Sequence, residues 1–240
     1  MEAQLKVSRI PSLRLRTVAD CVAPGAVVAD IGTDHAQLLA WLRIQGRITA
    51  GLGIDIAAGP LAQARRTLAA TRTEGVTLRQ GDGLSVLTPG EVDTVTIAGM
   101  GGARVIRMVD AAAAVVERLT RLVLQPNSDW TAVRRWLAAR GWVLHQERMV
   151  EDRGKFYVVW AIQPRPGPAA SWTEDELHLG PRLLLERPPA FTAWLQRERA
   201  RVDQALRRAS VAGPTKGPRL AALRAHADRL SRALAPPPDC

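Results

Sequence analysis

Short apolar runs alternate with amphipathic stretches through the first two thirds of the chain. Apolar runs of four to seven residues that end near Gly, Asp or Pro are typical of buried strands, and the amphipathic stretches between them are typical of helices. We expect strands at Ala26–Asp30, Ala50–Asp55, Val76–Gln80, Val92–Ala98 and Arg121–Leu124, and helices at Ala36–Gln45, Pro60–Thr71, Ala103–Glu117 and Thr131–Arg140.

Strands that alternate with helices in this way predict an α/β fold with a mostly parallel sheet and right-handed crossovers. The end of this region is different, because residues 142–163 show a strand, a polar Asp-Arg-Gly turn and a second strand. Such a pattern predicts a β-hairpin, so the sheet is expected to end in antiparallel pairing. The predicted architecture is Rossmann-like.

A Pro- and Gly-rich segment, residues 164–171, follows the hairpin. Beyond it, residues 172–235 show no strand pattern. Two stretches, 191–210 and 218–235, have apolar residues spaced three to four apart and predict an antiparallel pair of helices. We therefore expect two domains, 1–163 and 164–240.

Composition narrows the class of protein. The chain has 240 residues, of which 47% are hydrophobic, so it can bury a sizeable core. No apolar run reaches the roughly 20 residues that a membrane helix needs, and the N-terminus has no apolar signal core. Cys21 and Cys240 lie far apart and have no neighbours at metal-ligand spacing. We expect a cytoplasmic protein with no membrane segment, no disulfide framework and no metal site.

The formal net charge of +10 favours a polyanionic partner such as nucleic acid. Residues 1–163 hold 20 Lys and Arg against 15 Asp and Glu, and the much shorter region 164–240 holds 13 against 8. The C-terminal region is therefore the more basic by density. An excess of Arg over Lys with abundant Ala, Gly and Pro is also typical of GC-rich genomes, so charge alone leaves both interpretations open.

The ends of the strands are where a doubly wound sheet binds its ligand. The first strand runs into Asp30-Ile31-Gly32-Thr33-Asp34-His35, which has one glycine where a dinucleotide fingerprint needs three. This loop is too crowded and too negative for a pyrophosphate. It suits a ligand with a cationic centre and an amino-acid end, such as S-adenosylmethionine. The alternative for Asp34 is that it caps the following helix.

The other strand ends are also polar or rich in glycine. Asp55 follows the second strand at the distance from which an acid can accept hydrogen bonds from ribose hydroxyls. Residues 81–83 (Gly-Asp-Gly) and 98–102 allow close approach to the backbone, and the Asp carboxylate can accept from an adenine amine. Residues 125–127 offer amide groups beside the same crevice. Together these strand ends predict a nucleoside-type cofactor.

The sequence motifs at these strand ends resemble those of the bacterial TrmK family, S-adenosylmethionine-dependent enzymes that methylate N1 of adenine 22 in tRNA. The resemblance extends over nearly the whole chain, through the opening SLRLRTVADCV and the later LHLGPRLLLERPPAFTAWL. The motifs, in order, are ADIGTDHA, GIDIAAGPL, RQGDGL, DTVTIAGMGG and RLVLQPN.

This resemblance implies a class I methyltransferase fold with a C-terminal, coiled-coil-like helical domain. It implies a catalytic role for Asp34 and, through the opening motif, for Arg14. The departures are Thr33 where Ser is usual, Gln37 where Tyr is common and Asp55 where Glu is frequent. The residues implied to contact the cofactor are Asp30, Gly32, Thr33, His35, Asp55, Ile56, Asp82, Gly83, Ala98, Gly99, Met100 and Gly101.

Methylation at N1 of adenine requires no base, because this nitrogen carries an in-plane lone pair. We expect Asp34 to hold the adenine amino group and to favour the cationic product. Since N1 lies on the pairing edge, the base must leave its stack, and other residues must grip the tRNA. The candidates are Arg14, Arg16, Arg104, Arg134, Arg197, Arg201 and Arg208, with Arg135, Arg199 and Arg207 beside them. For each of these except Arg14, a solvated helix face is the ordinary alternative.

Two rival functions stay open from the sequence alone. One is a class I methyltransferase that acts on another RNA, and the other is a non-catalytic RNA-binding protein on the same frame. The complete series of polar strand ends argues against the second. We expect a monomer, although the C-terminal helices offer an alternative role in dimerisation.

Overall fold

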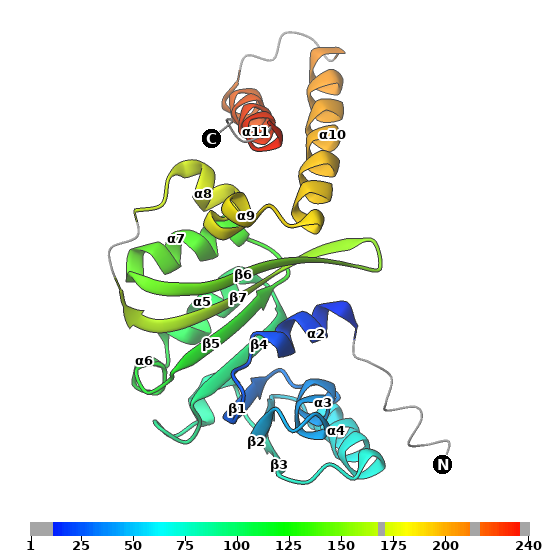
Figure 1. Cartoon of the computed structure of the whole chain (residues 1–240), viewed down its shortest axis with the longest axis vertical. Coiled ribbons are helices and arrows are strands. Elements are labelled where there is room, and N and C mark those ends of the chain that lie inside the picture. Colours follow the sequence, from blue (N-terminus) through cyan, green and yellow to red (C-terminus); the bar gives the residue numbers. More distant parts are fainter. Residues whose placement is uncertain (1–11, 168–170, 212–216, 236–240) are drawn as a thin grey trace.

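The computed structural model describes residues 12–167, 171–211 and 217–235 (Figure 1). A sheet occupies the centre of the molecule, helices cover it, and two long C-terminal helices project from one end. No helix in the described ranges is both long and apolar enough to cross a membrane.

The sheet has seven strands in the order β3-β2-β1-β4-β5-β7-β6. The first five are parallel, and β7 is antiparallel to both of its neighbours, so the predicted Rossmann-like sheet with an antiparallel hairpin is confirmed. The strand order reverses between β1 and β4, which is where ligands bind in open α/β sheets. The strands are β1 (Ala26–Ile31), β2 (Ile48–Asp55), β3 (Val76–Gln80), β4 (Thr94–Met100), β5 (Arg121–Pro126), β6 (Trp142–Asp152) and β7 (Lys155–Pro166).

Successive residues of β1 pack into different layers, as the two-residue period of a strand requires. Val28 packs in a cluster with α2 (Leu13–Asp20) and α3 (Gln37–Ile44). Ala29 and Ile31 pack in the main cluster with the helices of the other face. Those are α5 (Gly102–Asp110), α6 (Ala113–Val116) and α7 (Trp130–Arg140), whereas α4 (Ala58–Thr71) packs against α3 near the β3 edge.

The prediction of one continuous helix over Ala103–Glu117 is wrong, because the helix stops at Asp110 and a short second helix follows. The alanine-rich sequence contains no helix breaker there. Tertiary contacts override its propensity: the Asp110 carboxylate accepts bonds from Trp136 Nε1 (2.9 Å) and Arg140, and the turn lets Val115 and Val116 enter the core.

The β6–β7 hairpin turns at Arg153 and Gly154, with φ angles of 52° and 74°. Two positive φ angles in a two-residue loop are the signature of a type I′ turn, which matches the twist of the flanking strands. β7 continues to Pro166, into the segment that was predicted as a break.

Four helices follow the sheet: α8 (Glu174–Leu179), α9 (Pro181–Glu186), α10 (Pro189–Val211) and α11 (Pro218–Leu234). The sequence predicted the last two but not the short α8 and α9. Arg187, just before α10, donates to the Ala233 carbonyl, and Glu198 lies 3.3 Å from His226, so α10 and α11 run antiparallel. Their apolar side chains, including Phe191, Leu195 and Leu230, belong to the same cluster as the sheet core.

Candidate active site

The loop between β1 and α3 has an unusual backbone. Gly32, Asp34 and Ala36 have φ angles of 70°, 51° and 53°, and positive values are strained for Asp and especially for Ala. The loop is held because the amides of Gly32 and Thr33 both donate to the Ile54 carbonyl, at 2.8 and 3.0 Å. Such strain is kept where the surrounding structure imposes it, most often at functional sites.

Asp34 does not cap helix α3. The N-cap is Ala36, which makes no side-chain capping bond. The capping alternative for Asp34 is therefore wrong, and its carboxylate is available for another role. The side chain is 67% exposed, and its one ion-pair partner in the described chain is the adjacent His35, at 3.5 Å.

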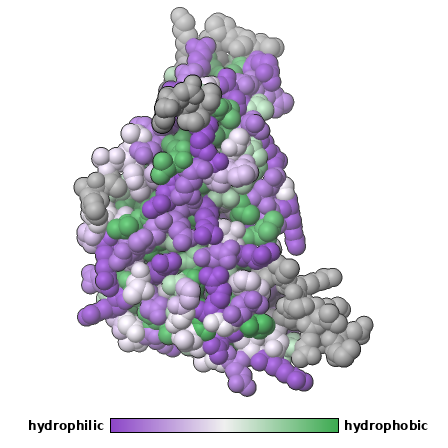
Figure 2. Space-filling view, in the orientation of Figure 1, coloured by the Kyte–Doolittle hydropathy of each residue, from purple (hydrophilic) through white to green (hydrophobic). Residues whose placement is uncertain are grey.

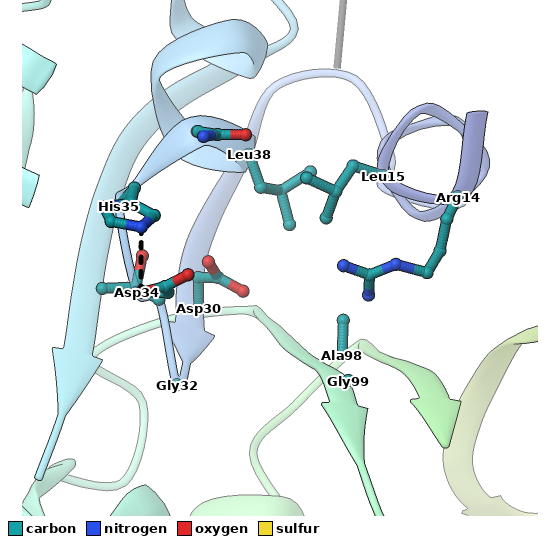
Figure 3. Close-up of a pocket in the computed structure, with 11 residues that line it drawn as sticks. Arg14, Leu15, Asp30, Gly32, Asp34, His35, Leu38, Ala98 and Gly99 are labelled. Atoms are coloured by element: carbon teal, nitrogen blue, oxygen red, sulfur yellow. Dashed lines mark ion pairs between the residues drawn. The ribbon is translucent and has the colours of Figure 1, made fainter. Parts of the chain in front are cut away.

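A cavity of about 330 Å³ opens at the switch point between β1 and β4 (Figure 3). Eight of the predicted site residues line it: Arg14, Asp30, Gly32, Thr33, Asp34, His35, Ala98 and Gly99. In Figure 3, Arg14 reaches from α2 on one side towards the loop that carries Asp30 and Asp34 on the other. The lining residues that were not predicted are Leu15, Gln37 and Leu38. Of these, only Gln37 had been singled out in the sequence, as a departure from Tyr.

Asp30 is a buried carboxylate, with 6% of its surface exposed. It accepts a 2.6 Å hydrogen bond from Thr96 Oγ1. Burial raises its pKa to about 6, against the opposing effects of the Thr96 hydrogen bond, the neighbouring Thr33 hydroxyl and the Arg14 charge. That Thr33 hydroxyl is buried and makes no hydrogen bond of normal geometry within the described residues. The site thus contains a buried carboxylate, Asp30, whose charge is not fully balanced, and a buried hydroxyl, Thr33, that could donate a further hydrogen bond.

Arg14 belongs to a hydrogen-bond network that also fixes the end of β4. Its Nη1 donates to Oε1 of the fully buried Gln125 (2.6 Å), which also accepts from the Gly99 amide (3.1 Å). Gln125 Nε2 donates to Asn127 Oδ1 (3.1 Å), and Asn127 Nδ2 donates to the Gly99 carbonyl (2.7 Å). The Arg14 guanidinium also lies 5.7 Å from the centre of the Tyr157 ring.

The sequence placed Gln125 and Asn127 beside the crevice but gave no sign that they hold Gly99. It did not point to Tyr157, because the hairpin residue reaches the site only through the β5–β7 pairing.

Two glycines that line the cavity have backbone angles in the left-handed region, which favours glycine. Gly99 has a φ of 81°, and a methyl group there would stand 3.5 Å from Arg14 Nη1, inside the cavity. At Gly32, with a φ of 70°, the same addition would lie 2.6 Å from Cε of Met100. Alanine would be strained at either position, and at Gly32 it would also collide with the Met100 side chain.

Six predicted cofactor residues lie along the same sheet edge, outside this cavity. Asp55 Oδ1 accepts from the Ala57 amide at 3.0 Å, and Gln80 Nε2 donates to the Ile56 carbonyl at 3.1 Å, so the loops after β2 and β3 are joined. The Ile56 side chain is unusually exposed for an isoleucine, at 55%. The six are Asp55, Ile56, Asp82, Gly83, Met100 and Gly101.

These groups suit a ligand with an amino-acid end. A buried carboxylate faces an arginine across unobstructed backbone, so an ammonium and a carboxylate on one ligand each have a partner of opposite charge. No group of three His, Cys, Asp or Glu that could hold a metal occurs in the described part of the chain.

The prediction that Arg134 contacts RNA is wrong. Its side chain is 1% exposed, and its Nε donates to Glu147 Oε1 at 2.7 Å. Nη1 donates to the His178 carbonyl at the end of α8 (2.9 Å), and the guanidinium lies 5.4 Å from the Trp160 ring centre. Because α7 turns this position towards the hairpin, Arg134 joins α8 to the sheet and cannot reach a nucleic acid.

Of the other predicted RNA contacts, Arg14 is half-buried and held by Gln125, whereas Arg16, Arg104, Arg197, Arg201 and Arg208 are exposed. Arg16 lies on α2 and Arg104 on α5, and neither makes a side-chain ion pair within the described residues. On α10, Arg197 donates to the Gly154 carbonyl (2.8 Å), Arg201 pairs with Glu198 (2.6 Å), and Arg208 is exposed near the end of the helix. Their contact with RNA stays a prediction.

Comparison with known proteins agrees with this geometry. The chain is 38% identical over 157 residues to the tRNA (adenine(22)-N(1))-methyltransferase of Bacillus subtilis strain 168, covering 65% of this chain and just under two thirds (64%) of that protein. The crystal structure of B. subtilis TrmK matches with a TM-score of 0.81 at 30% identity, covering 94% of this chain and 99% of that one.

A putative tRNA (m1A22) methyltransferase of Streptococcus pneumoniae, solved in complex with S-adenosyl-L-methionine, matches with a TM-score of 0.83 at 27% identity. That match covers 94% of this chain and 100% of the other. The family model described as tRNA (adenine(22)-N(1))-methyltransferase matches residues 28–227. The class I methyltransferase fold is therefore confirmed, and the chain belongs to the TrmK family.

Proposed function

We propose that this chain transfers a methyl group from S-adenosylmethionine to N1 of adenine 22 in tRNA. The observation that carries the proposal is the cavity in which buried Asp30 and Arg14 face each other beside the bare backbone of Gly99. Family membership supports the reaction and the substrate.

The cofactor supplies the methyl group and a positively charged sulfur. Asp30 and Arg14 would hold its amino-acid end, and the buried Thr33 hydroxyl offers one more hydrogen bond. Asp55 would accept from the ribose hydroxyls, and Asp82 from the adenine amine. The buried Asp30 carboxylate gains most from this arrangement, because positive charge nearby relieves the cost of its burial.

The protein's part in catalysis is positioning and electrostatic stabilisation. No general base is needed at N1, and positive charge develops on the adenine ring as the methyl arrives. Asp34 stands on the cavity wall with an exposed carboxylate that the strained loop aims. We propose that this carboxylate accepts a hydrogen bond from the adenine amino group and stabilises the positive charge that develops on the ring. His35, when protonated, would compete for this carboxylate.

The tRNA body must be gripped outside the cavity while the target base is extruded. Arg16 and Arg104 near the ligand edge, and Arg197, Arg201 and Arg208 on α10, would contact phosphates. We propose that the protein works as a monomer in the cytoplasm, with residues 164–240 acting as a tRNA-binding domain.

The test is methyl transfer from labelled S-adenosylmethionine to unmodified tRNA, with the product mapped by reverse transcription. N1 methylation blocks pairing, so we expect one strong stop at adenine 22, and none when a tRNA with guanine at this position is the substrate. Transfer to another RNA would favour the rival methyltransferase. Tight tRNA binding without transfer would favour the non-catalytic rival.

A further inference from the structure

A second cavity, of about 510 Å³, lies where the hairpin turn, the end of β5 and helix α10 meet. Four aromatic side chains line it: Trp130, Phe156, Tyr157 and Trp194. Each is half-buried, with part of its surface left open. Figure 2 shows that the face of the molecule seen in this view is mainly hydrophilic, with separate hydrophobic patches. We call this cavity the hairpin pocket.

The hairpin pocket adjoins the candidate active site through two residues. Asn127 lines the pocket and donates to the carbonyl of Gly99, which lines the first cavity. Tyr157 lines the pocket, and its ring lies against Arg14 of the first cavity. A ligand in the hairpin pocket would therefore be separated from the first cavity only by side chains that contact both.

The rings of the pocket are held before any ligand arrives. Trp130 Nε1 donates to the Pro126 carbonyl at 3.0 Å, and its ring centre lies 6.0 Å from that of Trp194 at 53°. The Arg197 guanidinium covers Phe156 at 5.9 Å and is tied to the hairpin turn. Rigid rings lose little entropy when a planar ligand stacks on them.

The rim of the hairpin pocket is positively charged. Its lining carries Lys155, Arg197 and Arg201 against Glu198, and Glu151 lies 4.0 Å from Arg197 outside the lining. Glu198 is already paired with Arg201 at 2.6 Å and with His226 at 3.3 Å. Lys155 makes no side-chain ion pair with any residue that the structure describes. Aromatic walls with a cationic rim are how proteins bind single-stranded nucleic acid: bases stack on the rings and phosphates meet the cations.

We infer that the hairpin pocket binds an unpaired nucleotide of the tRNA, next in the chain to the target adenine. The inference rests on the proposed function, because extruding the target base leaves its neighbours without their stacking partner. A second copy of the chain is the less suitable occupant, since it would bring a rim of the same charge. Stacking without base-specific contacts would make the pocket tolerant of sequence.

Photocrosslinking tests this placement directly. tRNA carrying 5-iodouridine on either side of the target adenine is irradiated with the full-length protein, and the crosslinked residue is identified by mass spectrometry. We expect crosslinks to Phe156, Tyr157, Trp130 or Trp194, and none to them from iodouridine placed in the acceptor stem. Crosslinks from the neighbouring positions that map elsewhere would overturn the inference.

Affinity measurements supply a second readout. We expect Phe156→Leu to weaken tRNA binding roughly 5- to 150-fold, as loss of one stacking ring does. Arg197→Gln should weaken it less, and the matched Arg65→Gln on α4, at the far end of the molecule, should leave it unchanged. Affinity for S-adenosylhomocysteine, measured by calorimetry, should stay the same in all three variants, because none of these residues lines the first cavity.

The outcomes separate this inference from the proposed function. If the wild type methylates adenine 22 but neither Phe156→Leu nor Arg197→Gln weakens tRNA binding, the pocket is not a nucleotide site and the function stands. If Phe156→Leu changes sedimentation of the protein and not tRNA affinity, the pocket is an interface between copies. If the wild type neither binds nor methylates tRNA, both proposals fail.

Discussion

Two buried carboxylates, Asp30 in the candidate active site and Glu147 in the hairpin, have opposite surroundings. Glu147 accepts from Arg134 Nε (2.7 Å) and Trp160 Nε1 (2.8 Å) through one oxygen, and from the amides of Arg182 (3.1 Å) and Leu183 (3.4 Å) through the other. Asp30 has one close side-chain donor, Thr96, and otherwise faces the cavity.

The difference separates a structural carboxylate from a binding one. Glu147 has its charge balanced and its oxygens satisfied, so a ligand would add nothing. Its contacts hold α9 on the sheet, and those of its partner Arg134 hold α8. Asp30 is buried without full compensation, which destabilises the free protein and favours a bound cation. Burial alone therefore does not identify a functional acid; unmet hydrogen-bonding and charge do.

Removing Glu147 should have the largest effect. Glu147→Ala leaves Arg134 buried and unpaired, so we expect the free energy of unfolding, measured by urea denaturation, to fall by about 3–5 kcal/mol. Replacing both residues, as in Arg134→Met with Glu147→Leu, should recover much of this loss. Glu174→Ala, which breaks an exposed arginine pair, is the control and should change stability little. If Glu147→Ala changes the free energy of unfolding only slightly, the structural role of Glu147 is refuted.

Asp34→Ala should reduce turnover about 100- to 1,000-fold, the usual cost of losing one group that stabilises transition-state charge. Affinity for the cofactor should change less than about threefold, because Asp34 is assigned to the adenine side. Asp34→Asn is the matched variant, since Asn tolerates the φ of 51° and removes only the charge. Single-turnover kinetics and calorimetry separate the two quantities. Loss of cofactor affinity with turnover kept would make Asp34 a cofactor ligand.

Asp30→Asn should stabilise the free protein near pH 7 and lower its affinity for the cofactor. The folded-state pKa of about 6 lies above the ordinary aspartate value of 3.8, so the contribution of Asp30 to stability is fully present below pH 4 and is lost as pH rises through 6. For this shift in pKa, the free energy of unfolding falls by roughly 3 kcal/mol between these pH values. Thermal melts of wild type and variant from pH 4 to 7 should diverge accordingly.

Cofactor binding gives the opposite pH dependence at the same residue. A cation beside Asp30 favours its charged form, so wild-type affinity for S-adenosylmethionine should fall as pH drops below about 6. In Asp30→Asn the affinity should be weaker and nearly independent of pH over that range. Identical pH profiles for the two proteins would remove Asp30 from the cofactor site.

The smallest expected effects belong to the exposed arginines. Arg16→Gln and Arg104→Gln should each weaken tRNA binding about threefold and lower the slope of log affinity against log salt by roughly one, as loss of one phosphate contact does. The double variant Arg134→Met with Glu147→Leu should leave that slope unchanged, because Arg134 is buried and both charges of the pair are removed together. Filter binding across a salt series distinguishes the two classes of arginine.

The parallel sheet, the hairpin and the helical pair were predictable because each follows from a local period of apolar residues and from turn residues with specific backbone angles. The helix break after Asp110 was not, because tertiary contacts decide it. The short helices α8 and α9 were missed although each begins with a local signal, the Thr173–Glu176 capping box and Pro181. Arg134 was misassigned for the same reason as the helix break: on a helix of mixed polarity, the sequence does not show which charged side chain turns inward.

The sequence by itself determined that each parallel strand ends in polar or glycine residues, and therefore which residues lie near the ligand. Only the tertiary structure decided what each of them does. It freed Asp34 from capping, left Asp30 short of positive charge, and tied Arg14 through Gln125 to Gly99. It also brought the hairpin aromatics beside the site. These outcomes depend on burial and on contacts between residues far apart in the chain, which local patterns do not encode.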